Sequence, residues 1–255
     1  MHILFIGYGK TSQRAAKLLF AAGHQITTIS RSLKTDTFAH HLQQDVHQLD
    51  LSGIAPVDVA YVLLSPQAST VEAYQQTYVD TVAPIVRALK HHLIQKLIVV
   101  SSTRVYGENA GERVDDDTVA LPSDEQGRLL LQMERLYQKA FPEQCVIVRP
   151  TGIYSGSSAR MQKLAETTKS YPNIHWSNRI HINDLARFLV FMLHVEHAEK
   201  SYICTNNYPQ PLHERILELQ RELGLPELVL QSDKETGKRI FAERMKSVGF
   251  QLEHN

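Results

Sequence analysis

The chain begins with MHILFIGYGKTSQRAAKLL, residues 1–19, and this stretch decides the fold. Its apolar run at 2–6 predicts a buried strand, and the apolar residues that follow at spacings of three and four predict a helix. Gly7 and Gly9 lie between the two, where the chain must turn sharply and where the backbone must approach a pyrophosphate closely. The third glycine of the G-x-G-x-x-G fingerprint is replaced by Ser12, which is small enough to be tolerated there.

The start of this helix predicts phosphate contacts. From Lys10 onward the first backbone N–H groups have no helical partner, and they carry a partial positive charge that favours phosphate. The hydroxyls of Thr11 and Ser12 can donate further hydrogen bonds. This context favours a nucleotide site, and the alternative is a degenerate turn that keeps the fold and has lost its ligand.

The end of the second predicted strand indicates which dinucleotide binds. Residues 25–30 are rich in β-branched side chains, and Arg31 and Ser32 follow them. An NAD site prefers an acid here to bind the ribose 2′-hydroxyl, whereas Ser30, Arg31 and Ser32 suit a 2′-phosphate. We therefore expect NADP to be preferred over NAD, and the alternative is that Arg31 is a solvated loop residue.

Strands alternate with helices through the first part of the chain. This order implies βαβ crossovers, and it predicts a doubly wound parallel Rossmann sheet over residues 1–155. Residues 156–255 predict a smaller α/β substrate-binding lobe, interleaved with the first part in one compact unit. The further predicted strands are 46–50, 58–64, 96–101, 144–149 and 201–204, and the predicted helices are 10–22, 34–43, 70–91, 125–139, 158–169, 183–195 and 211–223, with a loop at 103–124.

Composition excludes several classes of protein. Lys+Arg and Asp+Glu both number 27 in 255 residues, so the chain lacks the basic excess of a nucleic-acid binder. No run is apolar and long enough to span a bilayer, and no signal peptide is recognisable. Cys145 and Cys204 lie in apolar, strand-like contexts and indicate free thiols in a reducing compartment. We expect a cytoplasmic protein without a structural metal, because no ligand spacing is present.

Three later segments, together with the glycine turn, carry a family resemblance. They are SSTRVYG at 101–107, VRPTGIYSG at 148–156 and RIHINDLARFLVFML at 179–193. The set resembles the extended short-chain dehydrogenase/reductase family, the NAD(P)-dependent epimerase/dehydratase group, over nearly the whole chain. The resemblance implies a Rossmann cofactor domain, a small carboxy-terminal substrate lobe and a site between them.

The resemblance also implies roles for individual residues. Ser102 matches the family's catalytic Ser/Thr, and His181 and Asp184 match a segment beside the substrate lobe. The positions that match cofactor contacts are Asp50 and Leu51 for the adenine, Leu64 and Ser65 for the nicotinamide side, and Pro150 and Thr151 for the nicotinamide.

The catalytic helix departs from the family pattern. The family places a Tyr-x-x-x-Lys pair there, in which Tyr transfers a proton and Lys lowers the pKa of that Tyr. If Glu134 is aligned with the family's helix, Gln126 stands at the Tyr position and Leu130 at the Lys position. Gln cannot act as an acid near neutral pH, and Leu can neither donate nor accept. The chain therefore resembles the atypical members, which keep the nucleotide fold without this pair.

Three other side chains are candidates for the missing acid. Tyr106, Tyr154 and His181 are expected near the cleft, and His181 can titrate near neutral pH. For Tyr106 and Tyr154 the alternative is a packed ring with a satisfied hydroxyl, and for His181 it is a loop anchor.

Three functions remain open from the sequence. The first is an NAD(P)-dependent epimerase, dehydratase or oxidoreductase that acts on a nucleotide sugar or other small metabolite with a substituted acid–base. The second is a non-catalytic NADP-binding sensor or regulatory protein, and the third is a structural subunit that binds nothing. We favour the first, with a small-molecule substrate, no nucleic acid or membrane partner, and a monomeric or homodimeric state.

Overall fold

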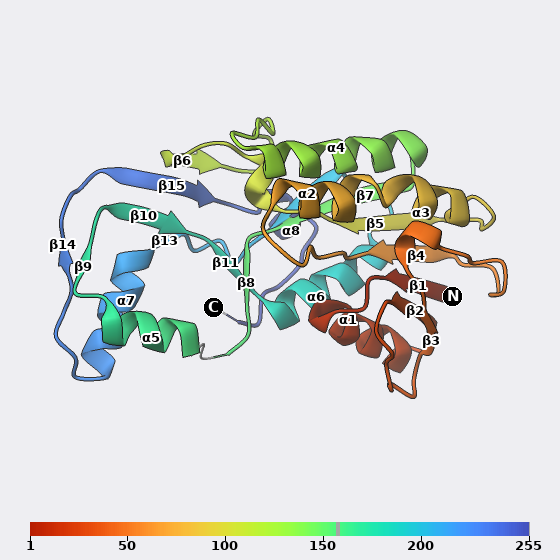
Figure 1. Ribbon diagram of the computed structural model, residues 1–255, viewed down its shortest axis with the longest axis horizontal. Coiled ribbons are helices and arrows are strands. Elements are labelled where there is room, and N and C mark those ends of the chain that lie inside the picture. Colours follow the sequence, from red (N-terminus) through yellow and green to blue (C-terminus); the bar gives the residue numbers. More distant parts are fainter. Residues whose placement is uncertain (157–158, 255) are drawn as a thin grey trace.

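A seven-stranded sheet, all of whose neighbouring strands pair in parallel, dominates the computed structural model, which describes residues 1–156 and 159–254 (Figure 1). Its interior strands β1 and β4 are buried along their whole length, as strands covered on both faces are. In spatial order the strands are β12 (Ser201–Cys204), β7 (Cys145–Pro150), β5 (Lys96–Val100), β4 (Val59–Val62), β1 (His2–Ile6), β2 (Gln25–Ser30) and β3 (His40–Gln43). The predicted doubly wound parallel sheet is confirmed.

Helices cover both faces of this sheet. On one face α1 (Lys10–Ala21) packs against α6 (Ile182–Phe191), which continues into the short turn η4 (Met192–His194). On the other face lie α2 (Val71–Tyr74), the π-helical turn η2 (Gln75–Val79), α3 (Val82–Leu89) and α4 (Glu125–Ala140), as Figure 1 shows.

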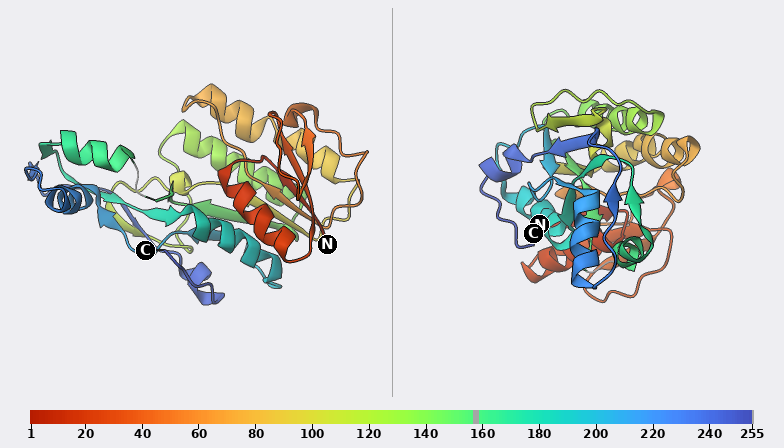
Figure 2. Two further views of the ribbon diagram at one scale, coloured as in Figure 1. Left: turned by 90° about the horizontal axis from the view of Figure 1, so that it is seen from below. Right: turned by 90° about the vertical axis from the view of Figure 1, so that its left-hand side faces the viewer.

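A second, smaller layer extends from one end of the Rossmann part (Figures 1 and 2). Its four-stranded sheet has the order β13 (Gln210–Pro211), β10 (Ile174–Ser177), β15 (Glu235–Ile240) and β6 (Ala110–Val114). Two short pairs accompany it, β8 (Gly152–Tyr154) with β11 (Arg179–His181) and β9 (Ser170–Tyr171) with β14 (Val229–Leu230). The helices of this part are α5 (Ala159–Thr167), α7 (Leu212–Glu222) and α8 (Glu243–Ser247).

The two parts of the chain, divided at residue 155 as expected from the sequence, exchange strands between their sheets. β6 comes from the first part of the chain and pairs with β15 in the lobe. β12 comes from the second part and pairs with β7 in the large sheet. Each sheet therefore contains a strand from the other part of the chain.

Four local predictions were wrong. The helix expected at 34–43 is replaced by β3, an edge strand whose polar side chains show no apolar run. The strand expected at 46–50 is the 3-10 turn η1 (Val46–Gln48). The helix expected at 70–91 is interrupted by η2, and Pro84 lies in the first turn of α3, where it removes no helical bond. The loop expected at 103–124 contains the turn η3 (Thr103–Val105) and β6.

Within residues 1–156 and 159–254, none of the helices combines the length and the apolar character that a bilayer crossing requires.

Candidate functional site

The turn after β1 has a backbone geometry that requires a glycine at position 7. Gly7 has a φ of +91°, and a Cβ built on it would lie 2.1 Å from the Leu63 carbonyl oxygen. No other residue fits this position without moving β4. Gly9 has an ordinary φ of −90°, and a Cβ there would meet no atom within 4 Å. The space beside Gly9 is therefore open to a ligand, as close approach of a pyrophosphate requires.

Ser12 explains how the turn does without its third glycine. The side chain is buried in α1, and its Oγ donates a 2.7 Å hydrogen bond to the carbonyl of Gly7. This bond ties the helix to the turn, so the Ser12 hydroxyl is already engaged inside the protein. The phosphate contact expected of Ser12 would require breaking this bond.

The amino end of α1 remains available for an anion. Gly9 is its N-cap and forms no side-chain hydrogen bond, and the first turn contains no acid. Lys10 and Thr11 begin this turn, and the Lys10 carbonyl accepts a bond from Arg14. The unpaired N–H groups of such a turn attract phosphate.

A cavity of about 540 Å³ opens beside the turn, and we call it the glycine-turn cavity. Seven of the residues expected to contact the cofactor meet in its wall: Gly7, Gly9, Ser30, Arg31, Ser32, Leu64 and Ser65. The wall is completed by residues that the sequence analysis did not single out, including Tyr8, Lys34, Gln44, Val46 and Gln67.

Two cations face this cavity without a fixed partner. In the described part of the chain, neither Arg31 nor Lys34 forms a side-chain ion pair. The hydroxyl of Ser30 donates to the Ser32 carbonyl at 2.8 Å. The two cations at the end of β2, of which Arg31 also acts on the charge of Asp45, favour an anionic group over a ribose hydroxyl.

Asp50 and Leu51 are not brought to this cavity. Asp50 is exposed, and its carboxylate accepts from the Ser52 backbone N–H at 2.9 Å, while Leu51 is buried in the core. Because β3 ends at Gln43 rather than near residue 50, the acid that directly follows it is Asp45. Asp45 and Val46 line an adjoining cavity of about 140 Å³ that shares Arg31, Leu64 and Ser65 with the larger one.

Asp45 is held as a carboxylate. Hydrogen bonds from the backbone N–H and the ring of His47, together with the charge of Arg31, hold the pKa of Asp45 below its usual value. The sequence alone did not locate the end of β3. An acid follows both possible ends, Asp45 after residue 43 and Asp50 at residue 50, so the choice between them depended on where the strand ends.

A second cavity, of about 460 Å³, lies between the Rossmann part and the lobe, and we call it the interdomain cavity. Ser102 and Thr151 line it from the carboxyl ends of β5 and β7. The Ser102 Oγ accepts from the Arg104 backbone N–H at 3.2 Å, which leaves its hydroxyl proton for another acceptor. Pro150 lies at the end of β7, and its carbonyl accepts from the Thr103 hydroxyl at 3.4 Å.

The lobe contributes the opposite wall of the interdomain cavity. Its residues are His175, Trp176, Asn178, Gly237, Lys238 and Ile240, from β10, β15 and the segment between β10 and β11. From the Rossmann side, Arg104 and Asp124 form an ion pair at 3.0 Å beside the amino end of α4. Trp176, the only tryptophan, was expected from the sequence either to line a pocket or to pack, and it lines this one. Gly237, Lys238 and Ile240 were not singled out, because β15 was not predicted.

The substituted pair on α4 has no acid–base capacity. Gln126 donates to the Ser69 carbonyl at 3.3 Å, and Leu130 is buried in the core. Two turns from Gln126, Glu134 forms a buried two-bond ion pair with Arg149, with contacts of 3.0 and 2.6 Å. The helix is therefore anchored to β7 while the expected catalytic positions are inert.

Tyr106, one of the three candidates for the missing acid, lines the interdomain cavity. Its hydroxyl accepts from the Arg149 guanidinium at 2.8 Å, within the buried network that contains Glu134. Burial raises the pKa of this phenol, and the charge of Arg149 opposes that rise only in part. The hydroxyl accepts this bond and keeps its own proton, so a role of Tyr106 in proton transfer stays a prediction.

His181 and Tyr154 lie in a third place, beside the carboxy-terminal tail. The His181 ring stacks on His254 at 3.9 Å and meets the edge of Tyr154 at 5.1 Å. Its Nδ1 accepts from the Asn183 N–H at the start of α6, so His181 is an N-cap. Burial, with the neighbouring His254, lowers the pKa of His181. Neither His181 nor Tyr154 lines the interdomain cavity.

Asp184 anchors the tail. It accepts from the backbone N–H groups of Glu253 and His254 at 3.0 and 2.9 Å, and it pairs with Arg187. The ligand atoms of Asp184, Glu253 and His254 lie within 4.8 Å of one another. Because Arg187 contacts both carboxylates, this cluster is explained as an ion-pair network.

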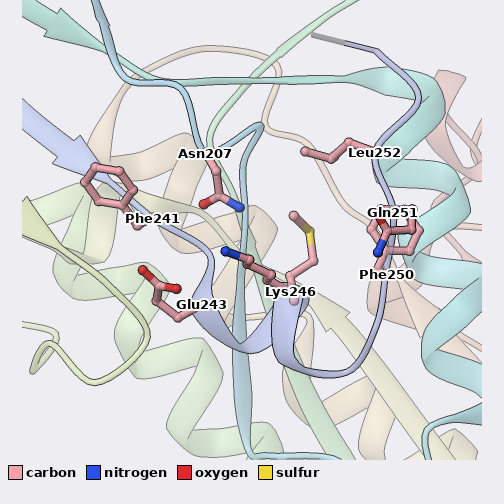
Figure 3. A pocket seen from close by; sticks show the side chains of 8 residues that line it. Asn207, Phe241, Glu243, Lys246, Phe250, Gln251 and Leu252 are labelled. Atoms are coloured by element: carbon pink, nitrogen blue, oxygen red, sulfur yellow. The ribbon is translucent and has the colours of Figure 1, made fainter.

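A further cavity of about 420 Å³ lies against the same tail (Figure 3). Its walls come from Asn207, α8 and the segment that ends at Leu252, and the Lys246 side chain extends toward Asn207. It contains none of the residues predicted to act on a cofactor or substrate.

Solved structures share this architecture. A protein from Methylobacillus flagellatus that carries the name NAD-dependent epimerase/dehydratase is 26% identical, with a TM-score of 0.80 over 99% of this chain and 93% of its own. The chain has the fold of an extended short-chain dehydrogenase/reductase. UDP-glucuronic acid 4-epimerase from Bacillus cereus, solved with NAD, is 17% identical, with a TM-score of 0.80 over 100% and 94% of the two chains.

The human epimerase family protein SDR39U1, solved with NADPH, is 16% identical to this chain. Its TM-score is 0.78 over 99% of this chain and 95% of its own. No protein-family model and no curated protein sequence matches the chain.

Proposed function

We propose that this protein binds NADP and uses it as an oxidoreductase or epimerase on a small metabolite of the nucleotide-sugar class. The observation that carries the proposal is the glycine-turn cavity, where Gly9 leaves room for a pyrophosphate and Arg31 and Lys34 have no fixed partner. A 2′-phosphate would provide the missing anion. The neighbours that contain NAD, NADPH or UDP-sugars support the chemical class of cofactor and substrate.

The two cavities together fit a dinucleotide. Gly7, Gly9 and Arg31 would hold the pyrophosphate and the phosphorylated ribose, and Leu64 and Ser65 would continue the wall. Pro150, Thr151 and Ser102 follow β5 and β7, at the same carboxyl edge of the sheet where such folds bind their ligands. The cofactor would supply a hydride, and the chain would hold the substrate oxygen beside the Ser102 hydroxyl.

A sensor function is the second candidate. Gln126 and Leu130 occupy the positions of the family's proton-transfer pair, and neither side chain can transfer a proton. A protein that binds NADP without turnover would keep Gly9 and Arg31 and tolerate these substitutions. Turnover of any sugar nucleotide with oxidation or reduction of the cofactor distinguishes the two candidates.

Cysteine burial and charge balance support a proposal for the setting of the protein. Cys145 and Cys204 are both buried and unpaired, which suits a reducing compartment such as the cytoplasm. The equal numbers of acidic and basic residues suit a small-molecule ligand rather than nucleic acid. We propose a monomer or a homodimer.

Titration with NADPH and NADH, followed by heat and nicotinamide fluorescence, tests the proposal. We expect NADPH to bind at least about tenfold more tightly, a difference of about 1.4 kcal/mol. Arg31→Ala should remove most of this preference, because NADH has no 2′-phosphate for the guanidinium to bind. Lys17→Ala, an exposed charge on α1, is the matched control and should change neither affinity. Equal or tighter binding of NADH would contradict the proposal.

A further inference from the structure

Lys238 is a cationic side chain in the wall of the interdomain cavity. It belongs to β15, the lobe strand between β10 and β6. Its side chain crosses to the Rossmann part, where the ammonium donates to the Tyr106 carbonyl in the loop that follows Ser102. The amine therefore stands in the same cavity as Ser102 and Thr151.

The surroundings of Lys238 leave its charge only partly compensated. Burial lowers the pKa of its ammonium below the usual 10.5, and Glu108, Asp124 and Glu112 oppose this effect by their charge. Within the described residues it forms no ion pair, because Asp124 is bonded to Arg104 and to the amino end of α4. His175, from the adjoining strand β10, is the other titratable group of the lobe in this wall.

The other candidates for proton transfer are engaged or remote. Tyr106 lines the same cavity, but its hydroxyl accepts from Arg149 and burial raises its pKa, while His181 and Tyr154 lie at the tail. Gln126 cannot release a proton. A lysine amine that is partly desolvated is able to exchange its proton closer to neutral pH than a surface lysine.

We propose that Lys238 is the proton donor and acceptor of this site, supplied by the lobe in place of the helix Tyr. This inference rests on the proposed function. In reduction, the hydride of NADPH adds to the carbonyl carbon, the C=O π bond breaks, and the Lys238 ammonium gives its proton to the oxygen. NADP⁺ and an alcohol result, and water returns a proton to the amine. In the reverse direction the neutral amine takes the hydroxyl proton while the hydride leaves to NADP⁺.

Ser102 would assist this step by position. The Ser102 Oγ accepts from the Arg104 N–H, and this bond leaves the hydroxyl proton of Ser102 free to be donated to the same substrate oxygen. Two donors on one oxygen stabilise the charge that develops there during hydride transfer.

Three variants separate proton transfer from charge and packing. Lys238→Met keeps the length of the side chain and removes the amine, whereas Lys238→Arg keeps the charge in a group that does not deprotonate. Lys234→Met is the matched control, because Lys234 is exposed and directly precedes the same strand. NADPH titration of each variant shows whether the cofactor site is intact.

The first measurement is carbon-13 NMR of reductively methylated whole protein. The Lys238 signal is assigned by its absence in Lys238→Arg and is followed with pH. We expect it to titrate below 10.5, the usual pKa of a lysine. Titration at the usual value would overturn the inference, even if NADPH binds. Failure of the wild type to bind NADPH or NADH would overturn the proposed function instead.

The second measurement is the rate of NADPH oxidation with 9,10-phenanthrenequinone or a panel of UDP-sugars as substrate. The variants are compared on each substrate that the wild type turns over. General acid–base catalysis contributes about 10²–10⁴-fold, so we expect both Lys238 variants to lose a kcat factor in this range with KM nearly unchanged. The Lys234 variant should keep the wild-type rate. A Lys238→Arg protein with wild-type kcat would contradict proton transfer and leave only a role for the charge.

Discussion

The glycine-turn cavity and the interdomain cavity lie at the same edge of one sheet, yet they depart from the family pattern to different degrees. In the first, the decisive features are backbone features: the positive φ of Gly7 and the open space beside Gly9. In the second, the decisive features are side chains, and Gln126 and Leu130 stand where a Tyr and a Lys are expected. Backbone geometry is required for folding as well as for binding, whereas a catalytic side chain can be replaced without loss of the fold.

The largest expected effect comes from the turn itself. Gly7→Ala should lower the free energy of unfolding by about 3 kcal/mol, because its left-handed φ costs about 1–2 kcal/mol and its Cβ would overlap the Leu63 carbonyl. Gly23→Ala is the matched control, since Gly23 has a φ of +87° and a Cβ there would meet nothing within 4 Å. Urea unfolding measures both. Equal losses would mean that the close approach to Leu63 contributes nothing.

Gly9→Ala should affect cofactor binding rather than stability, the reverse of the effect expected for Gly7→Ala. Its Cβ meets no protein atom, so stability should stay within about 0.5 kcal/mol of wild type. NADPH affinity should fall at least about tenfold, because the methyl group would occupy the space proposed for the pyrophosphate. Unfolding and calorimetry on one preparation give both values, and unchanged affinity would place the cofactor elsewhere.

The sequence predicted the backbone half of the site well and the side-chain half poorly. Gly7, Gly9, Arg31, Leu64 and Ser65 follow strands whose apolar runs are unmistakable, so their meeting at one cavity could be expected. Asp45 was missed because β3 is a polar edge strand, and an error of a few residues in its end moved the assignment to Asp50.

Long-range partners were out of reach for a different reason. Lys238 lies 132 residues from Tyr106, and no pattern near either position indicates that β15 joins β6. Asp116, in the acidic run 115–117, is buried and accepts from the backbone N–H groups of Ile203 and Arg244. Such pairings depend on the order of strands in the lobe, which local periodicity does not encode.

A smaller effect tests the structural role of Tyr106. Tyr106→Phe removes one hydrogen bond to a charged partner and should cost about 2 kcal/mol of stability, since Arg149 keeps both contacts with Glu134. Turnover on any active probe should remain unchanged, in contrast to Lys238→Met. A loss of kcat of a hundredfold or more in a folded variant would return the acid role to Tyr106.

The smallest effect concerns pH and the tail. The pKa of His181 is lowered from 6.5 by burial and by His254, so the folded state binds its proton less readily than the unfolded chain. The contribution of neutral His181 to the free energy of unfolding is complete above about pH 6.5, and it is lost as the pH falls below that value. His181→Asn keeps the N-cap and removes the titration, so the melting temperature of wild type should fall relative to this variant between pH 7.5 and about pH 5. Parallel profiles would show that His181 is not perturbed.

The most direct test of the account is a crystal structure of the protein with NADP⁺. We predict the pyrophosphate over Gly9 at the amino end of α1, the 2′-phosphate between Arg31 and Lys34, and the nicotinamide beside Ser102 and Thr151 in reach of Lys238. A dinucleotide bound with its nicotinamide outside the interdomain cavity, or soaked crystals with no dinucleotide in the glycine-turn cavity, would contradict it.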